Sequence, residues 1–267
     1  MKFVVSDLDG TLLHSHSVIS EYTVKTVDKL IKNNINFAIA TGRGQQGVQD
    51  ILKQLGIKPY LICNNGANIY TPDGKCIFDK RIPKDTVTKI LKEIRKNNLF
   101  YSAFQNEFYF HSKDEPVEDF TSRPYFTEIV VDNEEDIPDS NKIIVTNSDP
   151  QVLIKLVNTL KEKFSNEAEI MLSQPTCLDV APKGCSKGTG IENLAKIFSL
   201  TTDDFMAFGD GENDIEMLKT VGHPVIMENS QEILKELFSN TTLSNKEDGV
   251  AVYLTNFFNL QGEANEK

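Results

Sequence analysis

The chain has 267 residues, enough for one large domain or two smaller ones. Its 28 basic and 39 acidic residues give a formal net charge of −11. This charge argues against nucleic acid and against an anionic membrane surface as partners, because both require a basic patch. No stretch of the sequence approaches the ~18 consecutive apolar residues of a membrane span.

The start of the chain and its cysteines predict a cytoplasmic protein. Met1 and Lys2 lead directly into an apolar strand, so no secretory signal is expected. Cys63, Cys76, Cys177 and Cys185 form no CxxC pair, which argues against a zinc site or a redox motif. We interpret the four thiols as reduced, as in cytosolic proteins.

The first 63 residues predict a β-α-β-α-β pattern. Short apolar runs indicate buried strands, and apolar residues at helical spacing indicate the helices between them. The expected strands span 3–6, 35–40 and 60–63, with a helix capped by Ser20 and another over 48–55 that ends at Gly56. Strands that alternate with helices in this way favour a parallel sheet.

The pattern changes after a predicted hairpin around Pro72-Asp73-Gly74. Residues 84–182 predict an inserted α+β domain. Its expected elements are a helix around 87–94, an aromatic hairpin over 100–111, a strand at 143–146, a helix from Pro150 and a hairpin over 169–180. The aromatic hairpin could line a substrate pocket, but alternation along its strands favours core packing for one face.

The α/β pattern resumes after Pro182. Residues 183–188 predict a loop that enters a helix, and a strand at 205–208, a short helix, a strand at 224–227 and two further helices follow. We therefore expect an α/β fold with a doubly wound parallel sheet, built from 1–83 and 183–267 and interrupted by the domain at 84–182.

Polar residues follow three of the predicted strands. They are Asp7 and Asp9, then Thr41, and then Asp210 with Asn213 and Asp214. Because parallel strands point their carboxyl ends toward one edge of the sheet, we expect these groups to converge. An aspartate there can hold a hard cation or attack a phosphorus atom. Taken singly, each residue also fits a turn, a helix cap or a solvated side chain.

Four segments together resemble the motifs of haloacid dehalogenase-like (HAD) phosphatases. They are Asp7-Leu8-Asp9-Gly10-Thr11, Thr41-Gly42-Arg43, Lys187, and Gly209-Asp210-Gly211-Glu212-Asn213-Asp214. Three more segments are similar to the Cof-type subgroup: Asn64-Asn65-Gly66-Ala67, Ser186-Lys187-Gly188 and Leu243–Val250. The resemblance implies a Rossmann-like core, and the insertion at 84–182 lies where this subgroup carries its substrate-specificity cap.

The resemblance implies Mg²⁺-dependent chemistry through an aspartyl phosphate. Asp7 would be the nucleophile, and Asp9 would protonate the leaving group and later activate water. The Mg²⁺ ligands would be Asp7, the Asp9 backbone carbonyl and Asp210, with Asp214 as a direct or outer partner. The phosphoryl oxygens would contact the Thr41 hydroxyl, the Leu8, Gly42 and Asn213 amides, and the Lys187 ammonium. Arg43 would contact the leaving group or be a surface charge.

The expected function is a phosphatase that acts on phosphomonoesters of small metabolites, such as sugar phosphates or phosphorylated cofactors. One alternative is a phosphotransferase or mutase that uses the same intermediate. Another is a phospho-accepting signalling module or a silent binding protein, which would not need the Asp-x-Asp pair. The expected partner is a small phosphorylated molecule, and the sequence leaves the oligomeric state open.

Overall fold

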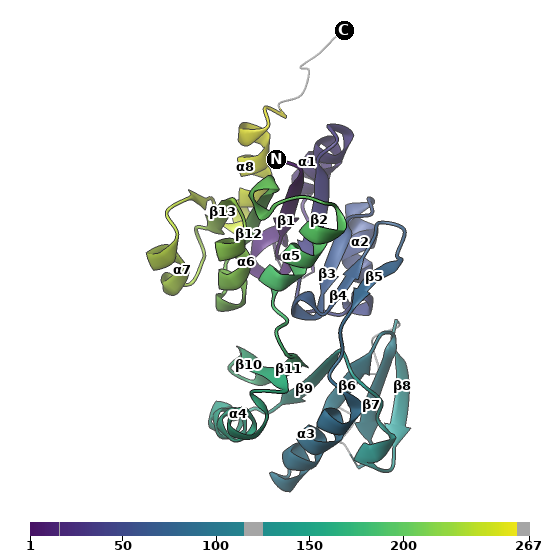
Figure 1. Cartoon of the computed structure of the whole chain (residues 1–267). Coiled ribbons are helices and arrows are strands. Elements are labelled where there is room, and N and C mark those ends of the chain that lie inside the picture. The colour runs from purple at the N-terminus through teal and green to yellow at the C-terminus, as the bar shows by residue number, and fades with distance from the viewer. Residues whose placement is uncertain (16, 115–124, 261–267) are drawn as a thin grey trace. The chain divides into compact units, whose positions relative to one another are not determined.

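The computed structural model describes residues 1–15, 17–114 and 125–260. The chain divides into two compact units, shown in Figure 1. The first unit comprises Met1–Gly42, Val48–Ile77 and Ser186–Lys267. The second comprises Phe78–Cys185 together with the short segment Arg43–Gly47. None of the described helices combines the length and the hydropathy that a bilayer crossing needs.

The first unit is built on an eight-stranded sheet in the order β14-β13-β12-β1-β2-β3-β4-β5. The strands are β1 (Phe3–Ser6), β2 (Asn36–Ala40), β3 (Tyr60–Cys63), β4 (Asn68–Tyr70), β5 (Cys76–Asp79), β12 (Phe205–Gly209), β13 (His223–Met227) and β14 (Thr241–Thr242). The run from β14 to β3 is parallel, and β4 is antiparallel to β3. The strand order reverses at β1, which makes its carboxyl end a topological switch point.

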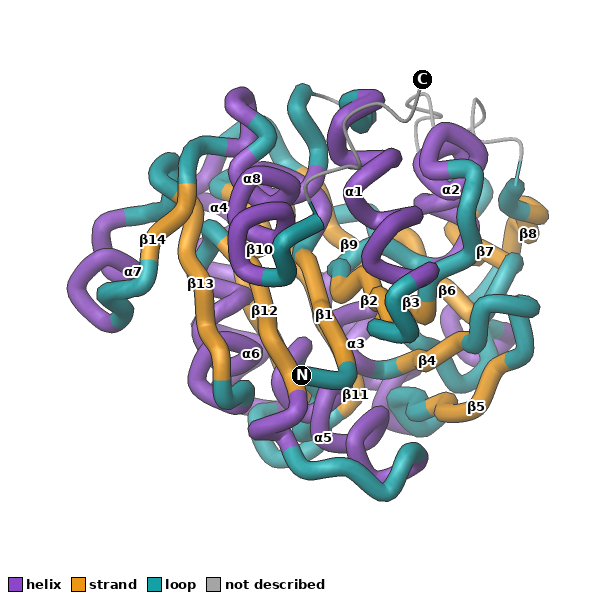
Figure 2. Tube along the Cα trace, turned by 90° about the horizontal axis from the view of Figure 1, so that it is seen from above, coloured by secondary structure: helices purple, strands orange, loops and turns teal. Residues whose placement is uncertain are grey.

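Helices cover both faces of this sheet, as Figures 1 and 2 show. One face carries α1 (Glu21–Lys32), α2 (Gln49–Leu55) and α8 (Gly249–Phe257), whose apolar residues share one core cluster with the strands. The other carries α5 (Lys187–Ile197) and α6 (Ile215–Thr220). The short helix α7 (Glu232–Leu237) lies between β13 and β14 in sequence. Residues Phe3–Ser6 of β1 are all fully buried, which explains their unbroken apolar run.

Local signals in the sequence set the ends of these helices. The Ser20 side chain accepts a hydrogen bond from the Thr23 amide and caps α1. Gly56 ends α2 in the left-handed conformation, with a φ of +66°. Two details differ from expectation. Lys187 is the first residue of α5 rather than part of the preceding loop, and α7 buries Leu234 while the rest of its apolar side is largely exposed.

The second unit contains a six-stranded sheet in the order β10-β11-β9-β6-β7-β8. The strands are β6 (Ser102–Gln105), β7 (Phe108–Ser112), β8 (Thr127–Val131), β9 (Lys142–Thr146), β10 (Ala168–Gln174) and β11 (Cys177–Pro182). The helices α3 (Lys84–Lys96) and α4 (Pro150–Phe164) share its apolar core. Edge strand β8 was not predicted, because four of its five residues are not buried and its pattern is weak.

The aromatic hairpin of β6 and β7 buries side chains on both of its faces. Tyr101 and Phe110 belong to the core cluster shared with α3 and α4. Phe104 pairs with Tyr109 across the strands, and their rings stack at 6.1 Å between centroids. The expectation of core packing is therefore met for Tyr101 and Phe110.

Candidate active site

The site begins where β1 ends. Asp7 follows Ser6, and its amide still donates to the Phe208 carbonyl of β12 at 3.0 Å. The chain then turns through a π-helical loop, Leu8–Leu12, closed by the Leu12 amide donating to the Asp7 carbonyl. The Asp7 side chain is only 8% exposed. The ladder between β1 and β12 thus fixes a buried carboxylate at the switch point of the sheet.

Gly10 allows this loop to approach the end of β12. Its φ is +87°, a conformation that favours glycine, and a Cβ atom there would lie 2.4 Å from Asp210 Oδ2. Next to it, the Thr11 hydroxyl donates a hydrogen bond to Asp210 Oδ1 at 2.7 Å. The two acidic segments, far apart in sequence, are therefore held together at this point.

Asp214 organises the turn that follows β12. Its Oδ2 atom accepts hydrogen bonds from the Asp210 amide at 2.9 Å and the Gly211 amide at 3.0 Å. The ligand atoms of Asp7, Asp210 and Asp214 all lie within 4.8 Å of one another. The structure therefore brings three of the predicted acidic residues into one cluster.

Lys187 lies inside this acidic cluster. Its Nζ atom donates to Asp7 Oδ1 at 2.6 Å and to Asp214 Oδ1 at 2.6 Å, and the residue is 1% exposed. Lys187 is the first residue of α5, where the helix dipole disfavours a positive charge. The two carboxylates offset this cost, which ties the position of the ammonium to that of Asp7.

Close backbone packing holds the start of α5. Gly66 has a φ of +90°, and a Cβ atom there would lie 2.1 Å from the Ser186 carbonyl oxygen. On the other side, a Cβ atom at Gly188 would lie 2.7 Å from the Glu216 carbonyl oxygen of α6. The segment Asn64–Ala67 therefore contributes to the site through contact with the residues that present Lys187.

The environment shifts the proton affinities of the cluster. Burial raises the pKa of Asp7 to about 8, although the Lys187 ammonium opposes this shift. Burial also raises the pKa of Asp210 to about 6, against the hydrogen bond from Thr11. Burial acts to lower the pKa of Lys187, but the Asp214 and Asp7 carboxylates outweigh it and raise the value. One ammonium thus faces three carboxyl groups, and the cluster favours additional positive charge.

The donor set fits a hard divalent cation such as Mg²⁺. All donors are oxygens, which Mg²⁺ prefers, and within the described residues Asp7 Oδ2 and Asp210 Oδ2 accept no hydrogen bond. Both oxygens of Asp214 already accept hydrogen bonds. Asp7 and Asp210 would therefore be the carboxylates that contact the ion, with Asp214 as their support.

The other predicted residues differ in burial. Leu8 is fully buried and Thr41 is 1% exposed, and the Thr41 carbonyl accepts from the Asn65 amide at 3.1 Å. Asp9 and Asn213 are exposed. The Asp9 side chain is not one of the three clustered carboxylates, although its charge contributes to the raised pKa of Asp210.

Gly42 and Arg43 lie on either side of the division between the units. Gly42 follows β2 in the first unit, and a Cβ atom there would lie 3.2 Å from Asn65 Oδ1. Arg43 belongs to the second unit, and its guanidinium donates to the Gly47 carbonyl at 3.3 Å.

Two contacts of the acidic loop were not foreseen. Thr11 had no assigned role, although it lies one turn beyond Asp7 and so faces the same cluster. Asn229 donates from Nδ2 to the Gly10 carbonyl at 2.9 Å. Asn229 follows β13 closely, so the rule that polar residues gather at strand ends would have indicated it.

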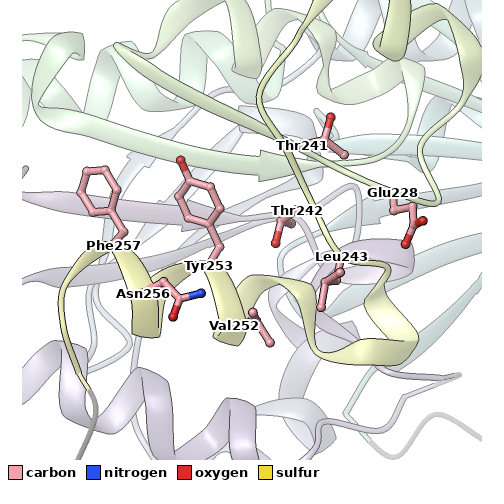
Figure 3. Close-up of a pocket in the computed structure, with 8 residues that line it drawn as sticks. All are labelled: Glu228, Thr241, Thr242, Leu243, Val252, Tyr253, Asn256 and Phe257. Carbon is pink, nitrogen blue, oxygen red and sulfur yellow. The ribbon is translucent and has the colours of Figure 1, made fainter.

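A separate groove of about 670 Å³ lies between β14 and α8 in the first unit. Figure 3 shows Tyr253, Asn256 and Phe257 projecting from α8 on one side, with Thr241 to Leu243 on the other. None of the clustered acidic residues lines it. The residues that line this groove are not suited to the chemistry of the acidic cluster.

Comparisons with known proteins find similar sequences and structures over nearly the whole chain. A family model described as haloacid dehalogenase-like hydrolase matches residues 4–254. An HMP-PP phosphatase of Yersinia pseudotuberculosis (serotype O:1b, strain IP 31758) is 30% identical over 252 residues, 93% of this chain and 92% of that protein. A haloacid dehalogenase-like hydrolase from Bacteroides thetaiotaomicron has a similar structure, with a TM-score of 0.85 and 25% identity over 96% of this chain and 99% of that one.

A second solved structure, of TM0651 from Thermotoga maritima, is similar with a TM-score of 0.83 and 27% identity. The match covers 96% of this chain and 97% of that one. The likeness to both structures therefore extends over the insertion as well as over the parallel sheet.

Proposed function

The chain belongs to the haloacid dehalogenase-like hydrolases, and from this premise we propose that it hydrolyses phosphomonoesters of small metabolites. The reaction depends on Mg²⁺ and passes through an aspartyl phosphate, an acyl phosphate formed on Asp7. The observation that carries the proposal is the placement of Asp7, whose carboxylate lies at the switch point, 2.6 Å from the Lys187 ammonium and beside Asp210 and Asp214.

The first step in this proposal is attack by Asp7. A carboxylate oxygen of Asp7 forms a bond to phosphorus as the bond from phosphorus to the leaving oxygen breaks. Asp9, exposed beside the cluster, gives a proton to that oxygen. Water then attacks the phosphorus, Asp9 takes its proton, and the Asp7 carboxylate is released with inorganic phosphate. Bound Mg²⁺ would offset the repulsion between the carboxylate and the phosphoryl group.

Positive and polar groups hold the phosphoryl oxygens in the proposed complex. Lys187 supplies a buried ammonium beside the nucleophile, where it stabilises negative charge more strongly than it would in water. Thr41 supplies a hydroxyl, and the amides of Leu8, Gly42 and Asn213 complete the set. Such positioning and charge stabilisation supply most of the catalysis in phosphoryl transfer.

The proposed substrate is a small phosphorylated metabolite, either a sugar phosphate or a phosphorylated cofactor. Relatives named HMP-PP phosphatase place HMP-PP first among the compounds to be tested. The net charge of −11 supports a small molecule rather than nucleic acid as the partner. The four free thiols support a cytoplasmic location, because an oxidising compartment would favour their pairing.

The test is phosphate release from a panel of phosphomonoesters and HMP-PP, with Mg²⁺ and with EDTA. We expect Mg²⁺-dependent release from at least one compound, and a covalent phosphate on the protein after acid quenching. Asp7→Asn should abolish both signals, and Asp179→Asn, which alters a buried carboxylate paired with Lys142 in the second unit, should keep both in the fraction of protein that folds. An Asp7→Asn variant as active as the original would overturn the assignment of the nucleophile.

The same assay separates the alternatives. Release of phosphate in preference to transfer onto added alcohols or sugars supports hydrolysis. Dominant transfer to the acceptor would show a phosphotransferase, and a phosphoprotein that survives for hours would show a signalling module. Either result would overturn the proposed function.

A further inference from the structure

The motif Leu243–Val250 has no role in the chemistry described above, yet one of its residues reaches the Asp7 loop. Asn245 begins a short 3₁₀ turn after β14, and its Nδ2 atom donates to the Leu13 carbonyl at 2.8 Å. The two residues are 232 positions apart in sequence. This contact lies at the end of the π-helical loop that carries Asp9 and Gly10.

Asn229 connects the same motif to the middle of that loop. The Asn245 amide donates to Asn229 Oδ1 at 2.9 Å, and Asn229 Nδ2 donates to the Gly10 carbonyl at 2.9 Å. Two asparagines thus bind the loop at Gly10 and at Leu13. Each asparagine donates to the loop through its side-chain NH₂ group, which an aspartate at either position would lack.

The residues after Asn229 hold the other acidic segment. The Gln231 amide donates to the Asp210 carbonyl at 3.0 Å, and the Ser230 hydroxyl donates to the Gly209 carbonyl at 3.4 Å. Residues 229–231 therefore contact both the Gly10 carbonyl and the backbone of Asp210. Their position fixes the distance between the two halves of the cluster.

We propose that Asn229 and Asn245 are positioning residues that hold the Gly10 and Leu13 carbonyls, and thereby keep the loop that carries Asp9 in its catalytic orientation. This inference rests on the proposed function, because it assigns a reason for that orientation. Gly10 has a φ of +87° and gains no rigidity from a side chain of its own. The two asparagines constrain the loop from outside, at Gly10 and at Leu13, and so limit the movement of Asp9, which precedes Gly10.

The main experiment compares Asn229→Ala, Asn245→Ala and the double variant with the original protein. We expect kcat to fall about 10- to 100-fold with KM changed less than about twofold, because misplaced catalytic groups cost rate more than binding. The double variant should be little worse than either single one, because the two residues act through one connected chain of hydrogen bonds. Additive losses would contradict the connected arrangement.

Two readouts do not depend on turnover. Hydrogen exchange at the Leu12 and Leu13 amides, both bonded inside the loop, should be about fivefold faster in each variant. Mg²⁺ binding measured by calorimetry should weaken by a similar factor. If the original protein hydrolyses nothing, the proposed function fails, but faster exchange and weaker Mg²⁺ binding would still support the constraint on the loop.

Asn240→Ala is the matched control. Asn240 also donates two hydrogen bonds within the first unit, to the Pro224 carbonyl and the Tyr253 hydroxyl, and neither acceptor belongs to the loop. We expect it to lower the melting temperature without changing kcat, loop exchange or Mg²⁺ binding. If Asn229→Ala and Asn245→Ala behave as Asn240→Ala does, their role is structural only and the proposal is wrong.

Conservative variants give a final check. Asn245→Asp keeps the backbone donor to Asn229 but removes the side-chain donor to Leu13, so it should lose kcat as the alanine variant does. Asn245→Gln retains a side-chain amide and should recover part of that loss. An Asn245→Asp protein with the original kcat and loop exchange would overturn the proposal.

Discussion

Each unit of the molecule contains a buried lysine paired with aspartate, and the two clusters differ in their balance of charge. In the second unit, Lys142 of β9 contacts Asp179 of β11 at 2.7 Å, with side chains that are 11% and 2% exposed. In the first unit, Lys187 contacts Asp7 and Asp214, and Asp210 lies within the same cluster. In the second unit the lysine contacts one buried carboxylate, whereas in the first unit one lysine faces a cluster of three carboxyl groups.

The difference separates a structural ion pair from a reactive site. A matched buried pair needs no further partner, although removing either member leaves a costly unpaired charge. In the cluster of the first unit, burial raises the pKa values of Asp7 and Asp210, and the neighbouring carboxylates add to this shift. The cluster therefore favours the binding of a cation, and it places uncommitted carboxylate oxygens where that cation would lie.

Lys187→Met and Lys142→Met should separate these roles most strongly. We expect Lys187→Met to lower kcat at least about 1000-fold, because it removes a buried charge beside the nucleophile. Lys142→Met should lower the free energy of unfolding by about 3–5 kcal/mol, because Asp179 loses its partner, with kcat retained in the folded fraction. Steady-state kinetics and urea unfolding of both variants measure these effects. A fully active Lys187→Met protein would show that the two lysines do not differ in this way.

Asp210→Asn should weaken Mg²⁺ binding while leaving the matched pair of the second unit unchanged. Asp210 supplies one of the two carboxylates with an oxygen free of hydrogen bonds among the described residues. We expect an affinity loss of about 100-fold, measured by calorimetry, since the ion loses a charged ligand. Unaltered Mg²⁺ binding would show that the ion does not contact Asp210.

Removal of Mg²⁺ should make the stability of the protein more sensitive to pH. Asp7 has a pKa of about 8 in the fold against an ordinary value of 3.8, so the metal-free fold binds more protons than the unfolded chain between these values. Its stability should therefore fall as pH rises from about 4 to about 8. Mg²⁺ binds ionised carboxylates, so the difference in melting temperature between samples with Mg²⁺ and samples with EDTA should grow across the same pH range. A difference that stays constant with pH would contradict this linkage.

Thr11→Val should have the smallest effect of the four. It removes the hydroxyl that donates to Asp210 and keeps the shape of the side chain. We expect Mg²⁺ affinity to fall about 5- to 10-fold, which corresponds to about 1 kcal/mol, the typical net contribution of one hydrogen bond. Thr86→Val is the control, because Thr86 makes a similar hydrogen bond to Glu167 in the second unit. Equal Mg²⁺ affinities in the two variants would show that Thr11 does not orient Asp210.

The sequence predicted the family, the α/β fold and the phosphatase class, and the comparisons confirm all three. The acidic cluster could be predicted because residues such as Asp7 and Asp210 directly follow apolar strands. The strand pattern alone therefore indicates that they converge. The roles assigned to individual residues remain predictions, Asp9 and Arg43 among them.

Other features depend on contacts that a linear pattern does not encode. Asn229 and Asn245 follow β13 and β14, but no periodicity shows that their amides reach Gly10 and Leu13. The edge strand β8 was missed because its exposed residues lack a repeating apolar face. Long-range hydrogen bonds and edge strands both depend on which segment happens to lie beside them in three dimensions.

The tight contact between Gly66 and the Ser186 carbonyl has a consequence for how this protein can change. Nearly the whole second unit lies between these two residues in sequence, yet their backbones touch. Lys187, which follows Ser186, is therefore held in place by a contact within the first unit. The second unit can therefore change in length or sequence while the reacting groups stay in register, and a bulky residue at Gly66 would disturb every such variant alike.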